Sequence, residues 1–198
     1  MNKSPSTGFI TRKRLRLPAY DYSLVGAYYV TLRANDGAML FGSAEDAEMH
    51  LNAAGRMVFS TCIEMPDHYD GVGLDVFCVM PNHVHAIVVI GDAHPWMASL
   101  EDGRAASVGC APPSGCRGEA RPSVPVLMQR FKSLTTTRYM CGVAQQGWVR
   151  FAGRLWQRSY YEHVIRDDDS LDEIRRYIIE NPLRWQLDPE NPDCKRSR

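Results

Sequence analysis

The chain has 198 residues, 44% of them hydrophobic, and its 23 basic and 23 acidic side chains give a formal net charge of zero. This length and composition predict one globular domain with a substantial core. No apolar run reaches the roughly 20 residues of a membrane-spanning helix, which argues against a membrane protein and leads us to expect a soluble, cytoplasmic one. The six cysteines show no CxxC spacing, which argues against a structural zinc site or a disulfide framework.

Basic and acidic residues are segregated along the chain. Residues 1–20 carry five basic and no acidic side chains, and residues 121–166 carry eight basic side chains and one acidic. Such segments are typical of polyanion binding, although a solvated surface balanced by acidic neighbours would give the same pattern. We expect residues 1–20 to form a basic N-terminal arm. The candidate phosphate contacts are Arg12, Lys13, Arg14, Arg16, Arg130, Lys132 and Arg138.

The first half of the chain alternates strand-like and helix-like patterns. Residues 26–36 are β-rich and predict a strand that an Asn-Asp-Gly turn ends. Residues 44–64 space their apolar side chains as a helix does, although Gly55 weakens that prediction. Residues 73–80 and 83–90 then predict two strands, apolar on both faces and joined by a Pro-Asn turn.

The second half begins with a change of composition. Residues 91–125 are rich in Gly, Ala, Ser and Pro, so we expect a flexible loop there. A helix is predicted over about 126–144, and a short strand within 154–165. An S-x-x-E capping box beginning at Ser170 signals the last helix, which Pro182 should end.

The resulting order β-α-β-β-α-β-α predicts an α+β fold. In this fold, helices cover an antiparallel sheet of ferredoxin-like or RRM-like type. No internal repeat is visible, and we expect a single domain over residues 21–186, followed by a C-terminal tail over 187–198.

His83 and His85 stand two positions apart in one of the predicted strands. Side chains i and i+2 of a strand lie on the same face, so the two imidazoles can converge on one divalent cation. Histidines that are simply buried and hydrogen-bonded give the same pattern. The pair alone therefore leaves both interpretations open.

The last predicted helix, Ser170 to Asn181, places Tyr177 and Asn181 one turn apart at the edge of its apolar stripe. A tyrosine there presents its hydroxyl where the core meets solvent. An asparagine offers a carbonyl oxygen, a hard ligand that suits Mg²⁺ or Mn²⁺. An ordinary amphipathic helix with a packed tyrosine and a terminal asparagine is the alternative.

Six segments occur in an order that is specific when taken together. They are RKRLRLPAYDYSLVGAYYVTLRAND, LFG, CVMPNHVHAIVVI, FKSLTT, WQRSYYEHVIRD and RRYIIENPLRW. In these segments the chain resembles the REP-associated tyrosine transposases, relatives of the single-tyrosine HUH transposases, over about residues 12 to 186. The resemblance implies that residues 21–186 form one HUH transposase domain with the IS200-like transposase fold.

The resemblance also implies roles for individual residues. His83 and His85 match the family's His-hydrophobic-His motif, which is catalytic and binds the metal. Tyr177 matches the nucleophile. Asn181 stands where related enzymes place a third polar metal ligand, which in many of them is a glutamine instead.

Two residues of the last predicted strand are further candidates. Tyr161 could stack on a base, and it is the main competitor of Tyr177 as the nucleophile. His163 could support the metal site from outside the ligand set, or have a structural or surface role.

The implied activity is metal-dependent cleavage and rejoining of single-stranded DNA near short palindromic hairpins. It proceeds through a 5′-phosphotyrosine intermediate and uses Mg²⁺ or Mn²⁺ as the only cofactor. The expected partner is single-stranded or hairpin DNA; we expect no protein partner and favour a monomer, although related enzymes form dimers. Two other functions remain open: a non-catalytic DNA or RNA hairpin-binding protein of the same fold, and a metal-dependent hydrolase built on the histidine pair.

Overall fold

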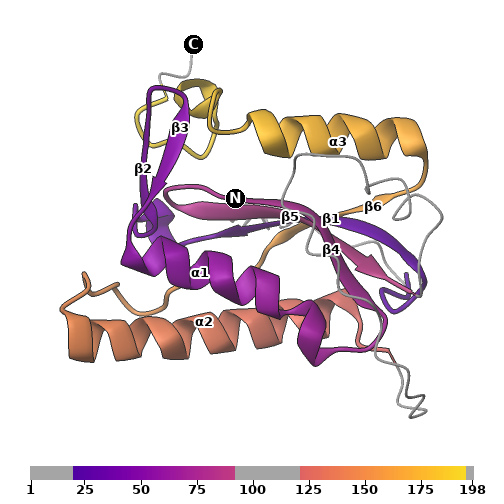
Figure 1. Cartoon of the computed structure of the whole chain (residues 1–198), viewed down its shortest axis with the longest axis horizontal. Helices are drawn as coiled ribbons and strands as arrows, with labels where there is room; N and C mark the ends of the chain where they lie inside the picture. Colours follow the sequence, from indigo (N-terminus) through magenta and orange to yellow (C-terminus); the bar gives the residue numbers. More distant parts are fainter. Residues whose placement is uncertain (1–19, 92–120, 195–198) are drawn as a thin grey trace, which may run out of the picture.

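The computed structural model describes residues 20–91 and 121–194, and its main element is a four-stranded antiparallel sheet (Figure 1). The strands lie in the order β4-β5-β1-β6. Their bounds are β1 (Gly26–Arg33), β4 (Val72–Val79), β5 (His83–Ile90) and β6 (Tyr161–Ile165). The predicted basic arm and most of the predicted loop over 91–125 lie outside the described residues.

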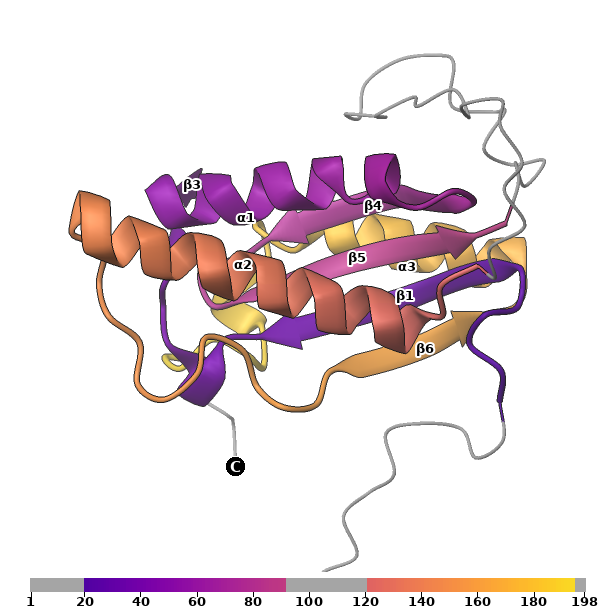
Figure 2. The same cartoon turned by 90° about the horizontal axis from the view of Figure 1, so that it is seen from below.

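Helices cover both faces of this sheet. Figures 1 and 2 show α1 (Ala53–Glu64) and α2 (Val124–Gln146) side by side on one face and α3 (Asp168–Glu180) on the other. None of the described helices is long and apolar enough to cross a membrane. The remaining short turns are η1 (Asn35–Gly37), η2 (Pro66–His68) and η4 (Trp185–Leu187).

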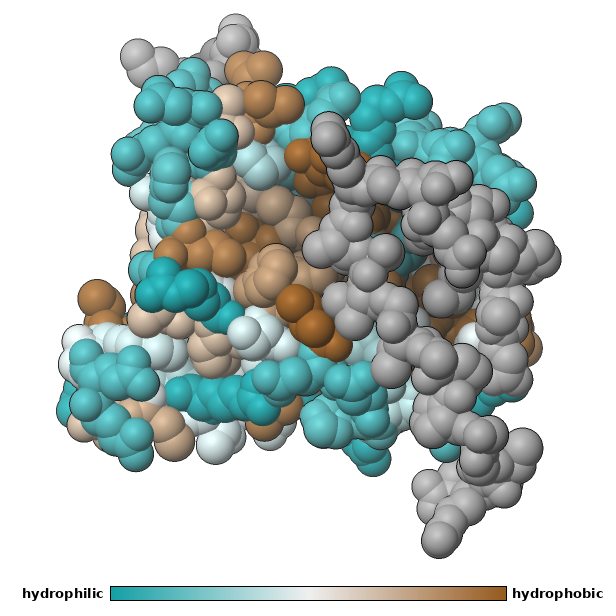
Figure 3. Space-filling view, viewed as in Figure 1, coloured by the Kyte–Doolittle hydropathy of each residue, from teal (hydrophilic) through white to brown (hydrophobic). Residues whose placement is uncertain are grey.

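The chain order and the sheet order together define a ferredoxin-like topology. Two strand-helix-strand units, β1-α1-β4 and β5-α2-β6, interlock so that β1 lies between β5 and β6. The predicted α+β fold is therefore confirmed, and α3 adds a second helical layer. Figure 3, seen from the β4 edge, shows hydrophobic residues gathered between the layers and hydrophilic residues along the outer sides of α2 and α3.

Alternate residues of β5 enter two separate cores. Val84 and Val88 belong to the larger cluster under α1 and α2, whereas Ile87 belongs to the smaller cluster under α3. Every residue of β5 is buried, so the prediction of a strand covered on both faces is confirmed. Because side chains alternate along a strand, His83 and His85 lie on the α3 face with Ile87.

The predicted helix over residues 44–64 is wrong in its first half. Strands β2 (Gly42–Glu45) and β3 (Glu48–Leu51) form a hairpin there, whose turn residues both have positive φ. α1 starts only after Asn52, whose side chain accepts the Gly55 N–H at 2.8 Å. Gly55, which counted against a helix, is required: a Cβ there would lie 2.0 Å from the carbonyl oxygen of Phe41.

α3 begins earlier than the capping box predicted. Its N-cap is Asp167, whose carboxylate accepts the Ser170 N–H at 2.8 Å, so Ser170 itself lies inside the first turn. Aspartate is as good an N-cap as serine, and a box pattern cannot choose between them. Arg175 fastens the helix to the sheet, since its guanidinium donates to both carboxylate oxygens of Asp75 in β4 at 2.7 and 3.1 Å.

The segment after α3 returns to the sheet. Asp188 and Asn191 are buried, and the side-chain amide of Asn191 donates to the Trp185 carbonyl at 2.9 Å. Glu190 forms an ion pair with Arg33 of β1. The residues that follow the predicted domain boundary at 186 therefore pack beside the two histidines.

Candidate metal and nucleophile site

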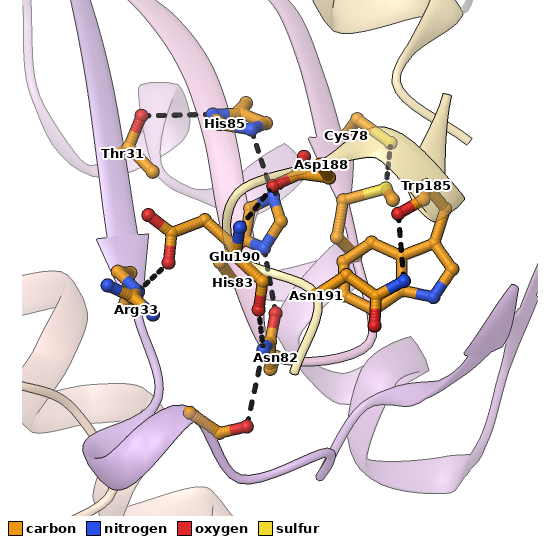
Figure 4. A network of polar contacts seen from close by, with 12 residues as sticks. Thr31, Arg33, Cys78, Asn82, His83, His85, Trp185, Asp188, Glu190 and Asn191 are labelled. Atoms are coloured by element: carbon orange, nitrogen blue, oxygen red, sulfur yellow. Dashed lines mark hydrogen bonds and ion pairs between the residues drawn. The ribbon is translucent and has the colours of Figure 1, made fainter. Parts of the chain in front are cut away.

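The two histidines of β5 face each other in a buried position (Figure 4). The Nε2 atoms of His83 and His85 are 2.9 Å apart. The Asn82 amide nitrogen donates to the carbonyls of Gly37 and Glu190, which leaves its Oδ1 to accept from His83 Nδ1 at 2.8 Å. His83 therefore carries its proton on Nδ1, and the lone pair of its Nε2 points at His85.

His85 has its own partners on the neighbouring strand β1. Its Nδ1 lies 2.8 Å from the Tyr29 hydroxyl and 2.9 Å from the Thr31 hydroxyl. The ring of Tyr29 also stacks on the imidazole, with centroids 5.7 Å apart. The sheet register places Thr31 directly opposite His85, so strand pairing fixes this contact.

Asp188 brings a carboxylate to the same place. It follows the η4 turn, and its Oδ1 accepts the Glu190 N–H at 2.6 Å. Its Oδ2 is buried, has no hydrogen-bond partner among the described residues and lies 3.8 Å from His83 Nε2. One ligand atom each from His83, His85 and Asp188 lies within 4.8 Å of the others, which makes these residues a candidate metal-binding group.

This donor set fits a divalent cation. Burial lowers the pKa of both histidines, that of His85 to about 3, so both imidazoles are neutral at neutral pH and their lone pairs are available. Neighbouring ligands of an octahedral ion at about 2.1 Å are roughly 3 Å apart, close to the observed Nε2 separation of 2.9 Å. Two imidazoles and a carboxylate suit Mn²⁺ and, with added waters, Mg²⁺.

The buried neutral histidines also predict a pH dependence of stability. Since their pKa values are lower in the folded protein than in the unfolded chain, the unfolded chain binds more protons below about pH 6.5. We expect the metal-free protein to be less stable at pH 5.5 than at pH 7, by on the order of 1–3 kcal/mol in urea unfolding. Stability continues to fall until the pH reaches the pKa values of the folded state.

Two variants test the cause. His83→Gln/His85→Gln should flatten the pH dependence, whereas His50→Gln, a change at an exposed histidine, should leave it intact. Equal pH dependence in the wild type and the double variant would show that other groups are responsible.

Tyr177 of α3 stands beside this group. Its ring centroid is 5.3 Å from that of His85 and 6.4 Å from that of Tyr29. Burial, and then the charge of Asp188, raise the pKa of Tyr177, while hydrogen bonds from Asn181 and Tyr29 act in the opposite direction. Without a positive charge nearby, the phenol is therefore protonated at neutral pH.

A cavity of about 320 Å³ opens at this point, so Tyr177 is accessible from outside although it touches buried residues. Its lining comes from β1, β5, the segment before β6 together with the first residue of β6, α3 and the segment after α3. The lining residues are Tyr29, Thr31, Arg33, His85, Gln157, Ser159, Tyr160, Tyr161, Tyr177, Asp188, Pro189 and Glu190.

Asn181 is buried and its side chain hydrogen-bonds to Tyr177, one turn earlier in the chain. Its Oδ1 has no hydrogen-bond partner among the described residues. Asn181 therefore stays a proposed ligand, beside Asp188, which no motif of the sequence indicated. Nothing local in the sequence singles out Asp188, because its approach depends on how the chain turns back after α3.

The two candidates on β6 have different positions. Tyr161 lines the cavity, is 49% exposed and contacts the Tyr29 ring at 5.9 Å between centroids, so it can meet a ligand there. His163 is exposed and pairs across the sheet with Tyr29. Its described electrostatic partner is Asp167, not the buried histidines.

The predicted phosphate contacts of α2 are not brought to this site. α2 covers the opposite face of the sheet (Figure 2). Each of the three side chains contacts a protein group there. Lys132 donates to backbone carbonyls of residues 157–159, Arg138 binds Thr61 and Glu64, and Arg130 lies 5.2 Å above the ring of Tyr69. Arg12, Lys13, Arg14 and Arg16 lie outside the described residues.

A larger cavity, of about 760 Å³, lies between α2 and residues 150–158. Arg150, Arg154 and Arg158 line it, and none of them forms an ion pair or side-chain hydrogen bond within the described part of the chain; no acidic residue contributes to the lining. Gln157 lines this cavity and the smaller one, so the two adjoin. The basic block over 121–166 was the sequence signal for these arginines, which the sequence analysis did not select.

Comparisons with known proteins agree with this architecture. No family model matches the chain. An uncharacterized protein of Haemophilus influenzae is 30% identical over 197 residues, which cover 95% of this chain and 97% of that protein. The solved structure of a REP-associated tyrosine transposase bound to a REP hairpin has a TM-score of 0.51 at 15% identity, covering 86% of this chain and 73% of that one. The chain therefore belongs to one family with the Haemophilus influenzae protein and has the fold of the REP-associated, IS200-like tyrosine transposases, as its motifs predicted.

Proposed function

We propose that this protein is a transposase that cleaves and rejoins single-stranded, hairpin-forming DNA through Tyr177. One observation carries the proposal: the Tyr177 ring lies 5.3 Å from that of His85, which belongs to a buried His-His-Asp group suited to a divalent cation. A nucleophile beside a cation site is the arrangement that metal-assisted phosphoryl transfer to a tyrosine requires.

His83, His85 and Asp188 would hold the cation, with Asn181 as a further candidate. Bound there, Mg²⁺ or Mn²⁺ would neutralise charge on the scissile phosphate and favour an ionised phenol nearby. The protein's own contribution is to keep both imidazoles neutral and in place. Asn82 fixes the ring of His83, and strand pairing fixes that of His85.

Tyr177 would perform the covalent step. Its oxygen loses its proton and attacks phosphorus, while the bond from phosphorus to the 3′-oxygen breaks and that oxygen leaves as a hydroxyl after taking up a proton. The products are a 5′-phosphotyrosine bond and a free 3′-hydroxyl. One phosphodiester is exchanged for another, so the hydroxyl can later reverse the reaction without an energy source.

The two cavities support the proposed substrate class. The smaller one, beside Tyr177, has room for a single nucleotide, and Tyr161 offers an exposed ring for stacking. The larger one offers a phosphate backbone the guanidinium groups of Arg150, Arg154 and Arg158, which have no ion-pair partner among residues 20–91 and 121–194. The transposase of the same fold was solved with a REP hairpin, which supports hairpin DNA as the ligand here.

The three arginines give a prediction for binding. We expect Arg150→Ala/Arg154→Ala/Arg158→Ala to weaken hairpin binding and to lower the slope of log K against log salt by about two to three, because up to three phosphate contacts are lost. Fluorescence anisotropy of a labelled hairpin between 50 and about 200 mM salt measures both quantities.

Arg56→Ala is the control, since Arg56 is exposed on α1 and donates to a backbone carbonyl away from both cavities. An unchanged salt slope in the triple variant would place the DNA elsewhere.

A further inference from the structure

Two hydroxyl groups converge on the outer nitrogen of His85. Tyr29 and Thr31 lie 2.8 and 2.9 Å from His85 Nδ1, and their hydroxyl oxygens are 3.1 Å apart (Figure 4 shows the Thr31 contact). Thr31 is buried and faces His85 across the sheet. A hydroxyl can donate or accept a hydrogen bond, so these contacts do not fix which nitrogen of His85 carries the proton.

The other ring nitrogen of His85, Nε2, limits which tautomer this histidine can adopt. His83 Nε2 presents a lone pair, because its Nδ1 proton is held by Asn82. At a separation of 2.9 Å and with no cation between them, His85 Nε2 has to donate a proton to that lone pair. His85 Nδ1 is then unprotonated and accepts from Tyr29 or Thr31.

If His83 and His85 held a divalent cation through their Nε2 atoms, this requirement would be reversed. A ligating nitrogen carries no proton, so neutral His85 must carry its proton on Nδ1 and donate it outward. A carbonyl or carboxylate partner would serve only this second state, as Asn82 Oδ1 does for His83. The hydroxyl groups of Tyr29 and Thr31 can pair with His85 Nδ1 in both states.

We propose that Tyr29 and Thr31 are positioning residues that let His85 exchange between two neutral tautomers, one bonded to His83 and one ligating a divalent cation. The exchange moves a proton from Nε2 to Nδ1 and leaves the charge of His85 unchanged. It rests on the cation site of the proposed function, but not on DNA cleavage.

The tautomer exchange also affects the surroundings of Tyr177, the proposed nucleophile. In the ligating state, His85 Nδ1–H donates to Thr31, and the Thr31 hydroxyl donates to the oxygen of Tyr29. The Tyr29 hydroxyl keeps its proton but no longer donates it to His85, so it can turn towards the cavity, where the Tyr29 ring contacts that of Tyr177. Cation binding and the orientation of Tyr177 are thereby linked through three side chains.

Nuclear magnetic resonance of the full chain with ¹⁵N-labelled histidine tests the tautomers directly. Without a cation, His85 should give the Nε2–H pattern; with saturating Mg²⁺, it should give the Nδ1–H pattern, while His83 keeps Nδ1–H throughout. The same His85 pattern in both states, with the cation bound, would overturn the inference and leave the proposed function standing.

Calorimetry with Mn²⁺ tests the hydroxyls. We expect Tyr29→Phe/Thr31→Val to bind Mn²⁺ roughly 10–100-fold more weakly, because the Nδ1 proton of the ligating state loses its acceptor. Replacing Thr31 with Ser instead of Val keeps the hydroxyl and should restore Mn²⁺ affinity. Thr136→Val makes the same Thr-to-Val change on α2 and should leave Mn²⁺ affinity unaltered. Wild-type affinity in the double variant would contradict the proposal, and the tautomer measurement on the wild type decides it if the double variant does not fold.

Discussion

Replacing Tyr177 with phenylalanine is expected to abolish the covalent protein–DNA adduct. The change removes only the hydroxyl oxygen that we propose as the nucleophile, so the ring contact with His85 and the fold of α3 are kept. The rate of adduct formation should fall by on the order of 10³-fold or more, as for other nucleophile deletions. Labelled single-stranded hairpins incubated with Mn²⁺ and separated on denaturing gels give the measurement.

Tyr161→Phe is the matched control, since Tyr161 lines the same cavity and is the other exposed tyrosine there. This variant should still form the adduct. An adduct that survives Tyr177→Phe and disappears in Tyr161→Phe would move the nucleophile to β6. Tight hairpin binding by the wild type without any adduct would favour the non-catalytic binding protein instead.

Removing one histidine of the pair is expected to have the second large effect. His83→Ala deletes a proposed ligand of the His-His-Asp group, so Mn²⁺ affinity should fall by about 10²-fold or more. Adduct formation should fall in parallel and recover partly when the Mn²⁺ concentration is raised. Electron paramagnetic resonance of free Mn²⁺ measures the affinity without DNA.

The third ligand can be assigned with the same measurement. Asp188→Asn removes the negative charge but keeps the hydrogen bond to Glu190 N–H, whereas Asn181→Ala removes the amide one turn after Tyr177. We expect the Asp188 change to weaken Mn²⁺ binding more, because its Oδ2 lies 3.8 Å from His83 Nε2. A larger effect of Asn181→Ala would support the ligand that the family motif implies.

Local patterns succeeded where one element contains all the information. The apolar run 83–90 predicted a strand buried on both faces, and its period placed His83 and His85 on one side. The same logic failed over residues 44–51. The hairpin there turns at Asp46 and Ala47, which both have positive φ. Neither residue type predicts such a turn as clearly as a glycine would.

The basic residues show a different limit. A charge block identifies a segment, but not the layer of the fold on which each side chain lies. Lys132 donates to backbone carbonyls and Arg138 pairs with Glu64. Arg150, Arg154 and Arg158 line a cavity and have no ion-pair partner within the described part of the chain. Pairing depends on neighbours from other elements, which the block itself does not contain.

By itself, the sequence determined the strand with its two histidines, the helix with Tyr177, and the family resemblance that links them. Only the tertiary structure brought Asp188 to the histidines, placed α2 on the opposite face, and joined His85 to Tyr29 and Thr31. The physical reason is that periodicity fixes the direction of a side chain within its own element. Contacts between elements depend on strand order, register and the path of the connecting chain.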